Sequence, residues 1–405
     1  MDDVPILLHE LTFVPEGEDE IVIGRADIDS FAVFPLDAAA VVRRLQGGHT
    51  VPEVSHWYLT TYGEPADIPD LVETLRELRF VRDPADEDHD APDGRVPSGG
   101  PVRWQALGRA LFSWPAWLLY AALVAGAVLL AAGTPQLRPS PGKVFFSSSL
   151  VVIELVVFAG QLLGVAWHEG FHVLAGRRLG LPSRLSIGRR LSFVVFETTL
   201  VGLMGVPRGK RVLPFCAGLV ADALFAAGLV CAAALDRTAG GAVGPFGRVA
   251  CGLAYLTLLR MAWQFLAYME TDLYYVVATV LRCPDLHRLA REQLRSRFWR
   301  AVGRPQRAPD SSGVTDRDLR LARRYAPVVV LGGALTLGLV LLGVVPVLLG
   351  FAARLAHALG TGRTDDPHLW DSAFAASAIL AQLALLVGVT VRDRRRRART
   401  APTAA

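Results

Sequence analysis

Residues 165–176 read VAWHEGFHVLAG and place an H-E-x-x-H pattern inside a long apolar run. Positions i and i+4 of a helix share one face, so His168 and His172 can bind the same Zn²⁺. Glu169 then stands where a general base is needed. Zinc lowers the pKa of its water towards about 7, which supplies a nucleophile at neutral pH. The alternative is a buried His pair satisfied by neighbours, but such a cluster in a membrane helix is costly without a function.

The composition is too apolar for an ordinary soluble protein: 52% of the 405 residues are hydrophobic, and the mean hydropathy is +0.35. Several apolar runs approach the length of about 20 residues that spans a bilayer. The N-terminus lacks a basic segment followed by an apolar core, so we expect no cleavable signal peptide. The four Cys show no C-x-x-C spacing, which argues against a disulfide framework and a thiolate zinc site. We expect a multi-span α-helical membrane protein with a small N-terminal soluble domain.

Residues 1–83 predict that soluble domain, an α+β fold of winged-helix type. The expected elements are short strands near 21–23 and 80–81 and helices over 36–45, 50–62 and 67–78. Thr50 and Glu53 form a capping box at the start of the second helix. A winged helix can bind DNA, but residues 1–80 hold sixteen Asp or Glu against five Arg. Because phosphate neutralisation needs the opposite charge, we exclude nucleic acid as a partner.

The remainder of the chain divides by composition. Residues 84–101 are rich in Asp, Pro and Gly and predict a flexible linker. About six transmembrane helices are expected, over 113–133, 144–166, 212–235, 247–269, 326–350 and 372–391. The fourth contains Arg260 and Gln264, so we expect it to face the protein interior. The predicted regions are a membrane core with the zinc site over 102–300, an Arg-rich cytoplasmic loop over 301–325, two additional helices over 326–391 and a basic tail over 392–405.

Arg and Lys residues gather in alternate loops, as the positive-inside rule requires of cytoplasmic segments. Residues 273–325 alone hold twelve Arg, and the tail after the last span is also basic. We therefore expect both termini in the cytoplasm, with the lipid bilayer as a partner and the tail in contact with anionic lipids. Forty Arg against two Lys indicate a GC-rich bacterial genome, so the expected location is the bacterial inner membrane.

A third zinc ligand is needed because a catalytic zinc usually has three protein ligands and a water. Asp272, expected at the inner end of the fourth span, should reach a depth similar to that of the two His. Glu270 is the nearby competitor. Asp222 is another, but its mid-span position places it deeper in the membrane. Asp272 is the favoured candidate.

The membrane core resembles a known family on specific residues. An H-E-x-x-H helix followed about 100 residues later by T-D-x-Y-Y at 271–275 is similar to site-2-protease-type intramembrane zinc metalloproteases, in the bacterial branch associated with peptide-modification clusters. The resemblance covers roughly residues 105–300. It implies that His168, His172 and Asp272 are zinc ligands and that Glu169 is the general base. That family often has Asp-Gly where this chain has Asp272-Leu273, which puts a bulkier residue beside the ligand.

The N-terminal domain resembles a second family. The stretch FAVFPLDAAAVVRRLQGGHTVPEV at 31–54, a Tyr-rich helix and a D-x₇-L-x-x-L helix are similar to PqqD-like peptide-recognition domains. The resemblance covers about 70 residues. It implies binding of a leader peptide from a precursor peptide substrate, for example by strand addition at the sheet edge. The alternative is a regulatory or purely structural cap.

Two further features bear on the site. Residues 185–206, rich in Val, Phe and Thr, predict a β-hairpin with a turn near Glu197, whose edge would hold an unwound substrate; the alternative is an interfacial loop. Asp222, Arg260 and Glu154 are ionisable groups inside apolar spans. Asp222 and Arg260 form a plausible pair, although Asp222 could instead bind substrate backbone. Glu154 shares a helix face with Gln161 and either lines a polar path or reaches the outer surface.

These features together predict a zinc-dependent intramembrane endopeptidase that removes the leader from a ribosomally synthesised, modified peptide precursor. One alternative is a non-proteolytic membrane component of peptide export or immunity. The intact Glu169 argues against it, since a pure binder has no need of that carboxylate. A third hypothesis is a site-2 protease that acts on a membrane-anchored regulator; it shares the chemistry and differs in substrate.

Overall fold

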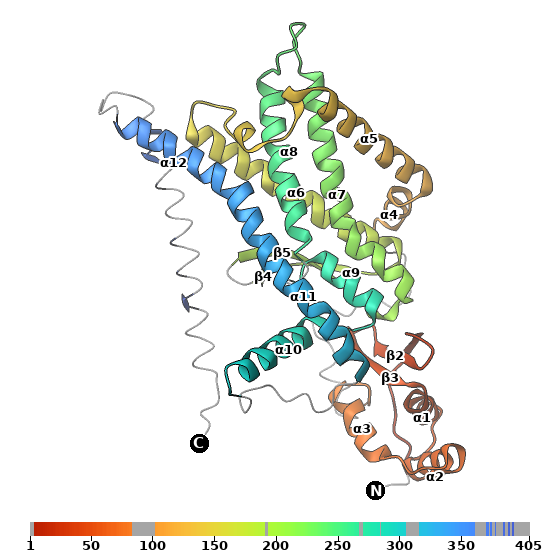
Figure 1. Ribbon diagram of the computed structural model, residues 1–405. Coiled ribbons are helices and arrows are strands. Elements are labelled where there is room, and N and C mark those ends of the chain that lie inside the picture. The colour runs from red at the N-terminus through yellow and green to blue at the C-terminus, as the bar shows by residue number, and fades with distance from the viewer. Residues whose placement is uncertain are drawn as a thin grey trace. The chain divides into compact units, whose positions relative to one another are not determined.

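The computed structural model describes residues 4–82, 102–190, 193–266, 270–283, 285–304 and 316–360, with isolated positions beyond them (Figure 1). The predicted linker at 84–101, almost all of the basic tail and most of the predicted span at 372–391 lie outside the described residues. The chain divides into two compact units, which we describe separately. The N-terminal unit comprises residues 1–109, 173–184 and 199–214, and the helical unit comprises residues 110–172, 185–198 and 215–405.

The N-terminal unit contains a three-stranded antiparallel sheet in the order β1-β2-β3. Its strands are β1 (Thr12–Pro15), β2 (Glu20–Arg25) and β3 (Ser30–Pro35). The predicted strand at 21–23 is the buried middle of β2, and Val81 forms a single antiparallel bridge with Leu8. The outer strands β1 and β3 form the two edges of this sheet.

Three helices follow the sheet where the sequence predicts them: α1 (Leu36–Gln46), α2 (Val51–Tyr62) and α3 (Ile68–Glu77). The capping box at Thr50 and Glu53 is confirmed. The helices bury one apolar face each, with Leu45, Val54 and Leu75 fully inaccessible to solvent. Most of a short fourth helix, α4 (Gln105–Leu111), also belongs to this unit, which includes the chain up to Arg109.

A hydrogen bond joins the first two helices of the N-terminal unit. The Tyr58 hydroxyl donates to the Asp37 carboxylate over 2.6 Å. This bond holds the pKa of Asp37 below its ordinary value and raises the pKa of Tyr58 to about 12. Asp37 therefore stays ionised, and Tyr58 stays protonated, across the physiological range of pH.

A buried arginine holds residues 199–214 in place within the N-terminal unit by hydrogen bonds and an ion pair. Arg211 is 2% exposed, and its guanidinium donates to the carbonyl oxygens of Val206 over 2.6 Å and Met204 over 2.8 Å. It also forms an ion pair with Glu16 over 2.8 Å. The backbone N–H of Gly202 donates to Asp29 over 2.7 Å. These polar contacts anchor the segment that contains the 3-10 turn η4 (Leu203–Gly205) against the sheet.

The helical unit contains most of the long apolar helices. Four segments of the described chain are long and apolar enough to cross a membrane: α5 (Trp114–Gly133), α6 (Leu150–Arg178), α7 (Arg208–Leu235) and residues 317–354. The last segment runs through α11 (Asp316–Leu339), a π-helical turn η7 (Val340–Val344) and α12 (Val345–Gly360). The expected α-helical architecture with several apolar helices is confirmed, and four of the six predicted spans have counterparts among the candidate spans of the described residues.

The predicted fourth span at 247–269 is shorter than expected. Its helix, α8 (Pro245–Gln264), contains Arg248 and Arg260 and is not one of the four candidate spans. The expectation that it faces the protein interior is confirmed, because small residues along it are buried, including Cys251 and Ala254 at 0% exposure. Ala254 packs with alanines of α5 and α7 in one apolar cluster. Small side chains let these helices approach closely, and α6, α7 and α8 lie side by side (Figure 1).

The β-hairpin prediction is confirmed, but its turn was misplaced. Strands β4 (Ser183–Arg190) and β5 (Phe193–Leu200) pair in a two-stranded sheet. Glu197, Thr198 and Thr199 lie inside β5, because β-branched residues on both sides favour extended backbone. The link between the strands falls at 191–192, outside the described residues.

Helices α9 (Asp272–Leu281), α10 (Leu286–Ala301) and α11 bury a shared apolar cluster. Leu286, Ala290 and Ala322 are its fully buried members.

Candidate metal centre

The two histidines of the H-E-x-x-H pattern lie on one face of α6, as their spacing predicts. His168 is 6% exposed and His172 is 8% exposed. Their Nε2 atoms face each other 3.2 Å apart. The four-residue separation is close to one helical turn, so an uninterrupted helix is sufficient to bring the two imidazoles together.

Asp272 completes a group of three donor atoms. Its Oδ2 lies 3.1 Å from His168 Nε2 and 3.3 Å from His172 Nε2. Among the described residues, these three form the one group of His, Cys, Asp or Glu whose potential ligand atoms lie within 4.8 Å of one another.

Asp272 reaches this position differently from the prediction. It does not end the fourth span; α8 stops at Gln264, and Asp272 is the first residue of α9. Gln264 holds the start of α9, because its side-chain Oε1 accepts from the Asp272 N–H over 3.3 Å and its carbonyl oxygen accepts from the Thr271 hydroxyl over 2.7 Å. The position of Asp272 at a helix N-terminus also favours its ionised form, since the helix dipole is positive there.

The spacing of the three donors fits a tetrahedral metal ion. Ligands bonded at about 2.0 Å in a tetrahedral zinc site lie about 3.3 Å from one another. The three observed separations, 3.1, 3.2 and 3.3 Å, form a nearly equilateral triangle of that size. Two imidazoles and one carboxylate are also a donor set that zinc accepts in catalytic sites, where the fourth position stays open. The residues therefore fit a zinc ion.

Asp222 lies on the opposite side of the His168 ring. Its carboxylate is fully buried, and Oδ2 is 3.1 Å from His168 Nδ1, although the alignment falls short of hydrogen-bond geometry. A negative charge at this distance favours the tautomer with the proton on Nδ1, which leaves the Nε2 lone pair facing the other donors. Asp222 is thus a supporting residue of His168 rather than a member of the donor triangle.

The predicted pair between Asp222 and Arg260 is confirmed. The Arg260 guanidinium donates to both Asp222 oxygens, from Nη2 to Oδ1 over 2.6 Å and from Nε to Oδ2 over 3.2 Å. Its Nη1 donates to Gln161 Oε1 over 3.0 Å. The network links α6, α7 and α8 through polar contacts, and it compensates a charge that would be costly to bury alone.

Two other carboxylates that were candidates from the sequence lie outside the donor group. Glu270 is exposed, and its backbone adopts the left-handed conformation with φ of 57°. Glu154 is partly buried on α6. Neither belongs to the three-residue group.

Glu169 has a partner that the sequence did not indicate. The Thr198 hydroxyl, on β5, donates to Glu169 Oε2 over 2.7 Å. This bond uses one carboxylate oxygen and leaves the other able to accept a proton. The contact joins residues 29 positions apart, on a helix and on a strand, and no local pattern signals it.

A glycine on α7 makes room for the donor triangle. A Cβ atom added to Gly218 would collide with Nε2 of both His168 and His172. Gly164 on α6 has the same relation to Arg260, since an added Cβ would lie 2.8 Å from Nη1. Glycine is common in apolar helices, so the sequence does not distinguish these two positions from the others.

Comparison of the chain with protein-family models, curated proteins and solved structures finds no match. The assignment of the site therefore depends on its residues and their geometry.

The first prediction concerns the ligand set. His172→Ala and Asp272→Ala should each lower the zinc content of the detergent-purified protein from about one ion per chain to well below half, because each removes one of three donors. Glu270→Ala should leave the zinc content unchanged, since Glu270 is exposed and outside the donor group. Elemental analysis by mass spectrometry measures the stoichiometry. Retention of zinc by the Asp272 variant would place the third ligand elsewhere.

The second prediction concerns Gly218. Gly218→Ala should abolish high-affinity zinc binding, because the added methyl group occupies the space of the two Nε2 atoms. Gly228→Ala, on the same helix with nothing within 4 Å of the added Cβ, is the matched control and should bind zinc as the wild type does. Competition with a chromophoric chelator gives both affinities. Equal zinc affinity in the two variants would contradict the close approach of α7 to the histidines.

The third prediction concerns Asp222. Asp222→Asn should weaken zinc binding by about 10- to 100-fold, the usual effect of removing the carboxylate behind a ligating histidine. The single variant also leaves the Arg260 charge without its carboxylate partner. The double variant Asp222→Asn, Arg260→Gln removes both charges and separates the two effects. We expect it to recover thermal stability while its zinc affinity stays low; recovery of affinity in the double variant would show that Asp222 acts only on folding.

Proposed function

We propose that this chain is a zinc-dependent intramembrane endopeptidase of the site-2-protease type. The observation that carries the proposal is the donor triangle of His168, His172 and Asp272, with Glu169 next to the first ligand and hydrogen-bonded to Thr198. The apolar helices α5, α6 and α7 support a location in a membrane. The donors suit a zinc ion, and such an ion supplies Lewis acidity, which polarises a carbonyl group and makes water a stronger acid.

The residues of the chain divide the work of hydrolysis between them. Glu169 accepts a proton from the attacking water as the water oxygen bonds to the scissile carbonyl carbon. Glu169 then delivers that proton to the amide nitrogen as the C–N bond breaks, so one water is consumed per bond. The Thr198 hydroxyl donates to Glu169 Oε2 throughout, and the Asp222 charge favours the His168 tautomer with the proton on Nδ1. Water must reach Glu169, and its partial burial is compatible with that access.

The proposed substrate is a ribosomally synthesised precursor peptide, and the proposed reaction removes its leader. The N-terminal unit would act as a winged-helix-like, PqqD-like recognition domain. Its sheet has two outer strands, β1 and β3, that offer main-chain groups for an added strand. The excess of acidic over basic residues in 1–80 suits a basic leader and does not suit nucleic acid.

The proposed location is the inner membrane of a bacterium, with six spans and both termini in the cytoplasm. The Arg-rich segments at 273–325 and after the last span support this orientation. In this topology His168 and His172 lie near the cytoplasmic end of α6, where water and zinc have access. Six spans would require α8 and residues 372–391 to cross the membrane together with the four candidate spans.

The fourth prediction tests this mechanism. Glu169→Gln keeps the size of the side chain and an oxygen for Thr198 to donate to, but it cannot accept a proton. Cleavage of a precursor peptide encoded by a neighbouring gene should slow by about 10²- to 10⁴-fold. Zinc content should stay at the wild-type level, because Glu169 is not a ligand.

Mass spectrometry of the products gives the rate and the cleavage position. Thr198→Val serves as the graded control: it removes only the hydrogen bond to Glu169 and should cost about tenfold. Wild-type cleavage by the Glu169 variant would exclude the mechanism. A zinc-loaded wild-type protein that cleaves no tested precursor would favour the non-proteolytic alternative.

A further inference from the structure

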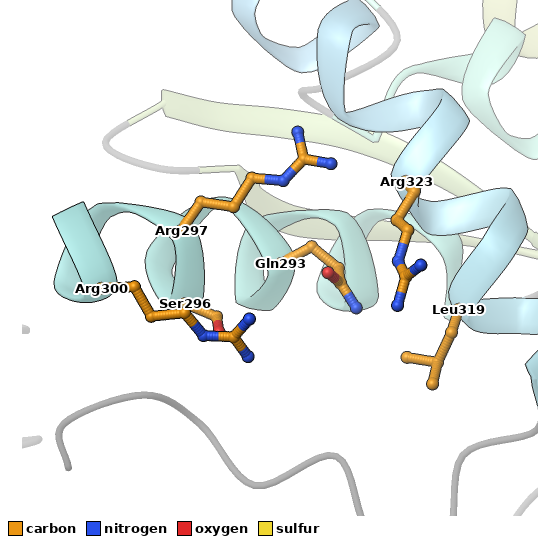
Figure 2. A pocket seen from close by; sticks show the side chains of 6 residues that line it. All are labelled: Gln293, Ser296, Arg297, Arg300, Leu319 and Arg323. Carbon is orange, nitrogen blue, oxygen red and sulfur yellow. The ribbon is translucent and has the colours of Figure 1, made fainter. Parts of the chain in front are cut away.

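A basic pocket lies in the helical unit, apart from the metal centre. It has a volume of about 440 Å³ and is formed by α10 and α11. Figure 2 shows the side chains that line it, which are Gln293, Ser296, Arg297 and Arg300 on α10 and Leu319 and Arg323 on α11. Three guanidinium groups, an amide and a hydroxyl therefore share this pocket with one apolar side chain, and its lining contains no carboxylate.

The arginines that line the pocket are solvent-exposed side chains. Within the described residues, Arg297, Arg300 and Arg323 form no ion pair. Arg288, at the start of the same helix, instead pairs with Asp285 over 2.8 Å and with Glu292 over 3.2 Å. Like charges that line one pocket repel each other, so a bound anion would stabilise it.

The helices that carry these arginines are packed firmly together. Leu286 and Ala290 of α10 and Ala322 of α11 are fully buried, and Tyr325 is 5% exposed. Arg323 directly follows Ala322, so its backbone is held by this cluster. The backbone of the pocket is thus held by a packed helix pair, so an anion need only order the exposed arginine side chains.

The sequence around Arg323 places the pocket at the edge of an apolar span. Arg323 lies near the start of the candidate span at 317–354, and the unbroken apolar run begins at Ala326. Three residues of helix correspond to about 4.5 Å along the axis. A charge one turn before the hydrocarbon region lies at the depth of lipid headgroups.

Helix α10 has the composition of an interfacial helix. It is rich in arginine and carries Phe298, which is 59% exposed, beside Trp299. Basic helices with exposed aromatic residues lie in the headgroup region, where the rings enter the acyl boundary and the charges meet anionic lipid.

We propose that this pocket binds the phosphate group of an anionic phospholipid headgroup. Guanidinium groups bind phosphate oxygens in bidentate fashion, and three arginines line this pocket together with Gln293 and Ser296, whose amide and hydroxyl are further donors. The site is separate from the proposed peptidase chemistry and does not depend on it. It ties the arginine-rich segment between α9 and the apolar part of α11 to the membrane surface.

The fifth prediction uses short-chain lipids and the full-length protein in detergent. Isothermal titration calorimetry compares dioctanoyl phosphatidylglycerol, dioctanoyl phosphatidylcholine and inorganic phosphate. We expect the anionic lipid to bind at least about tenfold more tightly than the other two, because only it combines net negative charge, a phosphodiester and acyl chains. Inorganic phosphate that binds as tightly as the anionic lipid would overturn the lipid assignment and make free phosphate the ligand.

Matched variants separate the pocket from general charge. R297Q/R300Q/R323Q should weaken binding of the anionic lipid by at least about tenfold, since it removes the charge-assisted hydrogen bonds. The control R291Q/R295Q/R324Q removes the same charge from three exposed arginines, two on α10 and one on α11, that do not line the pocket. It should change binding by less than about threefold.

A third variant guards against misfolding and tests geometry. R297K/R300K/R323K keeps the net charge but cannot form bidentate contacts, so its affinity should fall between those of the wild type and the Gln variant. All variants are compared for monodispersity and zinc content before titration. An equal loss of lipid binding in the pocket and control triple variants would refute the pocket and leave only a diffuse basic surface.

Discussion

The buried Asp222 carboxylate imposes the condition that the rest of the metal centre satisfies. A carboxylate at 0% exposure inside an apolar helix is stable only with a positive partner and good hydrogen bonds. Arg260 supplies both, and Gln161 in turn accepts from Arg260. Because these residues come from α7, α8 and α6, the network sets the lateral position of three helices at the level of His168.

Close helix packing is the second requirement, and glycine meets it. Polar side chains at a helix interface need space, and a glycine on the facing helix leaves that space because it has no side chain. Gly218 leaves the space in which the two Nε2 atoms lie, and Gly164 leaves the space for the Arg260 guanidinium. The donor separations of 3.1–3.3 Å are therefore a result of helix spacing as much as of the ligands themselves.

The sequence predicts those features of the site that depend on residues close together in the chain. The facing histidines follow from a four-residue spacing on one helix, and the α2 cap follows from Thr50 and Glu53, so both are local and were predicted. The Asp222–Arg260 pair was predictable because buried charges must find partners. The contact of Thr198 with Glu169 depends on the register of a strand against a helix, and the contact of Gly218 with the histidines depends on helix spacing; neither quantity is encoded in a local pattern.

Asp272 was predicted to lie near the two histidines, and it does, but the helix predicted to carry it was wrong. Continuous hydropathy predicted one helix over 247–269, but α8 ends at Gln264 and a new helix begins at Asp272. The resemblance noted in the sequence made Leu273 a departure from an Asp-Gly pattern. Leu273 lies within α9, where leucine is among the favoured residues, so no glycine is required after the ligand.

The left-handed conformation falls two residues before Asp272, at Glu270, with φ of 57°. The left-handed backbone conformation of a non-glycine residue costs about 1–2 kcal/mol. The chain thus accepts modest strain outside the donor group and keeps Asp272 on regular helical backbone, where its N–H donates to Gln264 and its carboxylate is stabilised by the helix dipole.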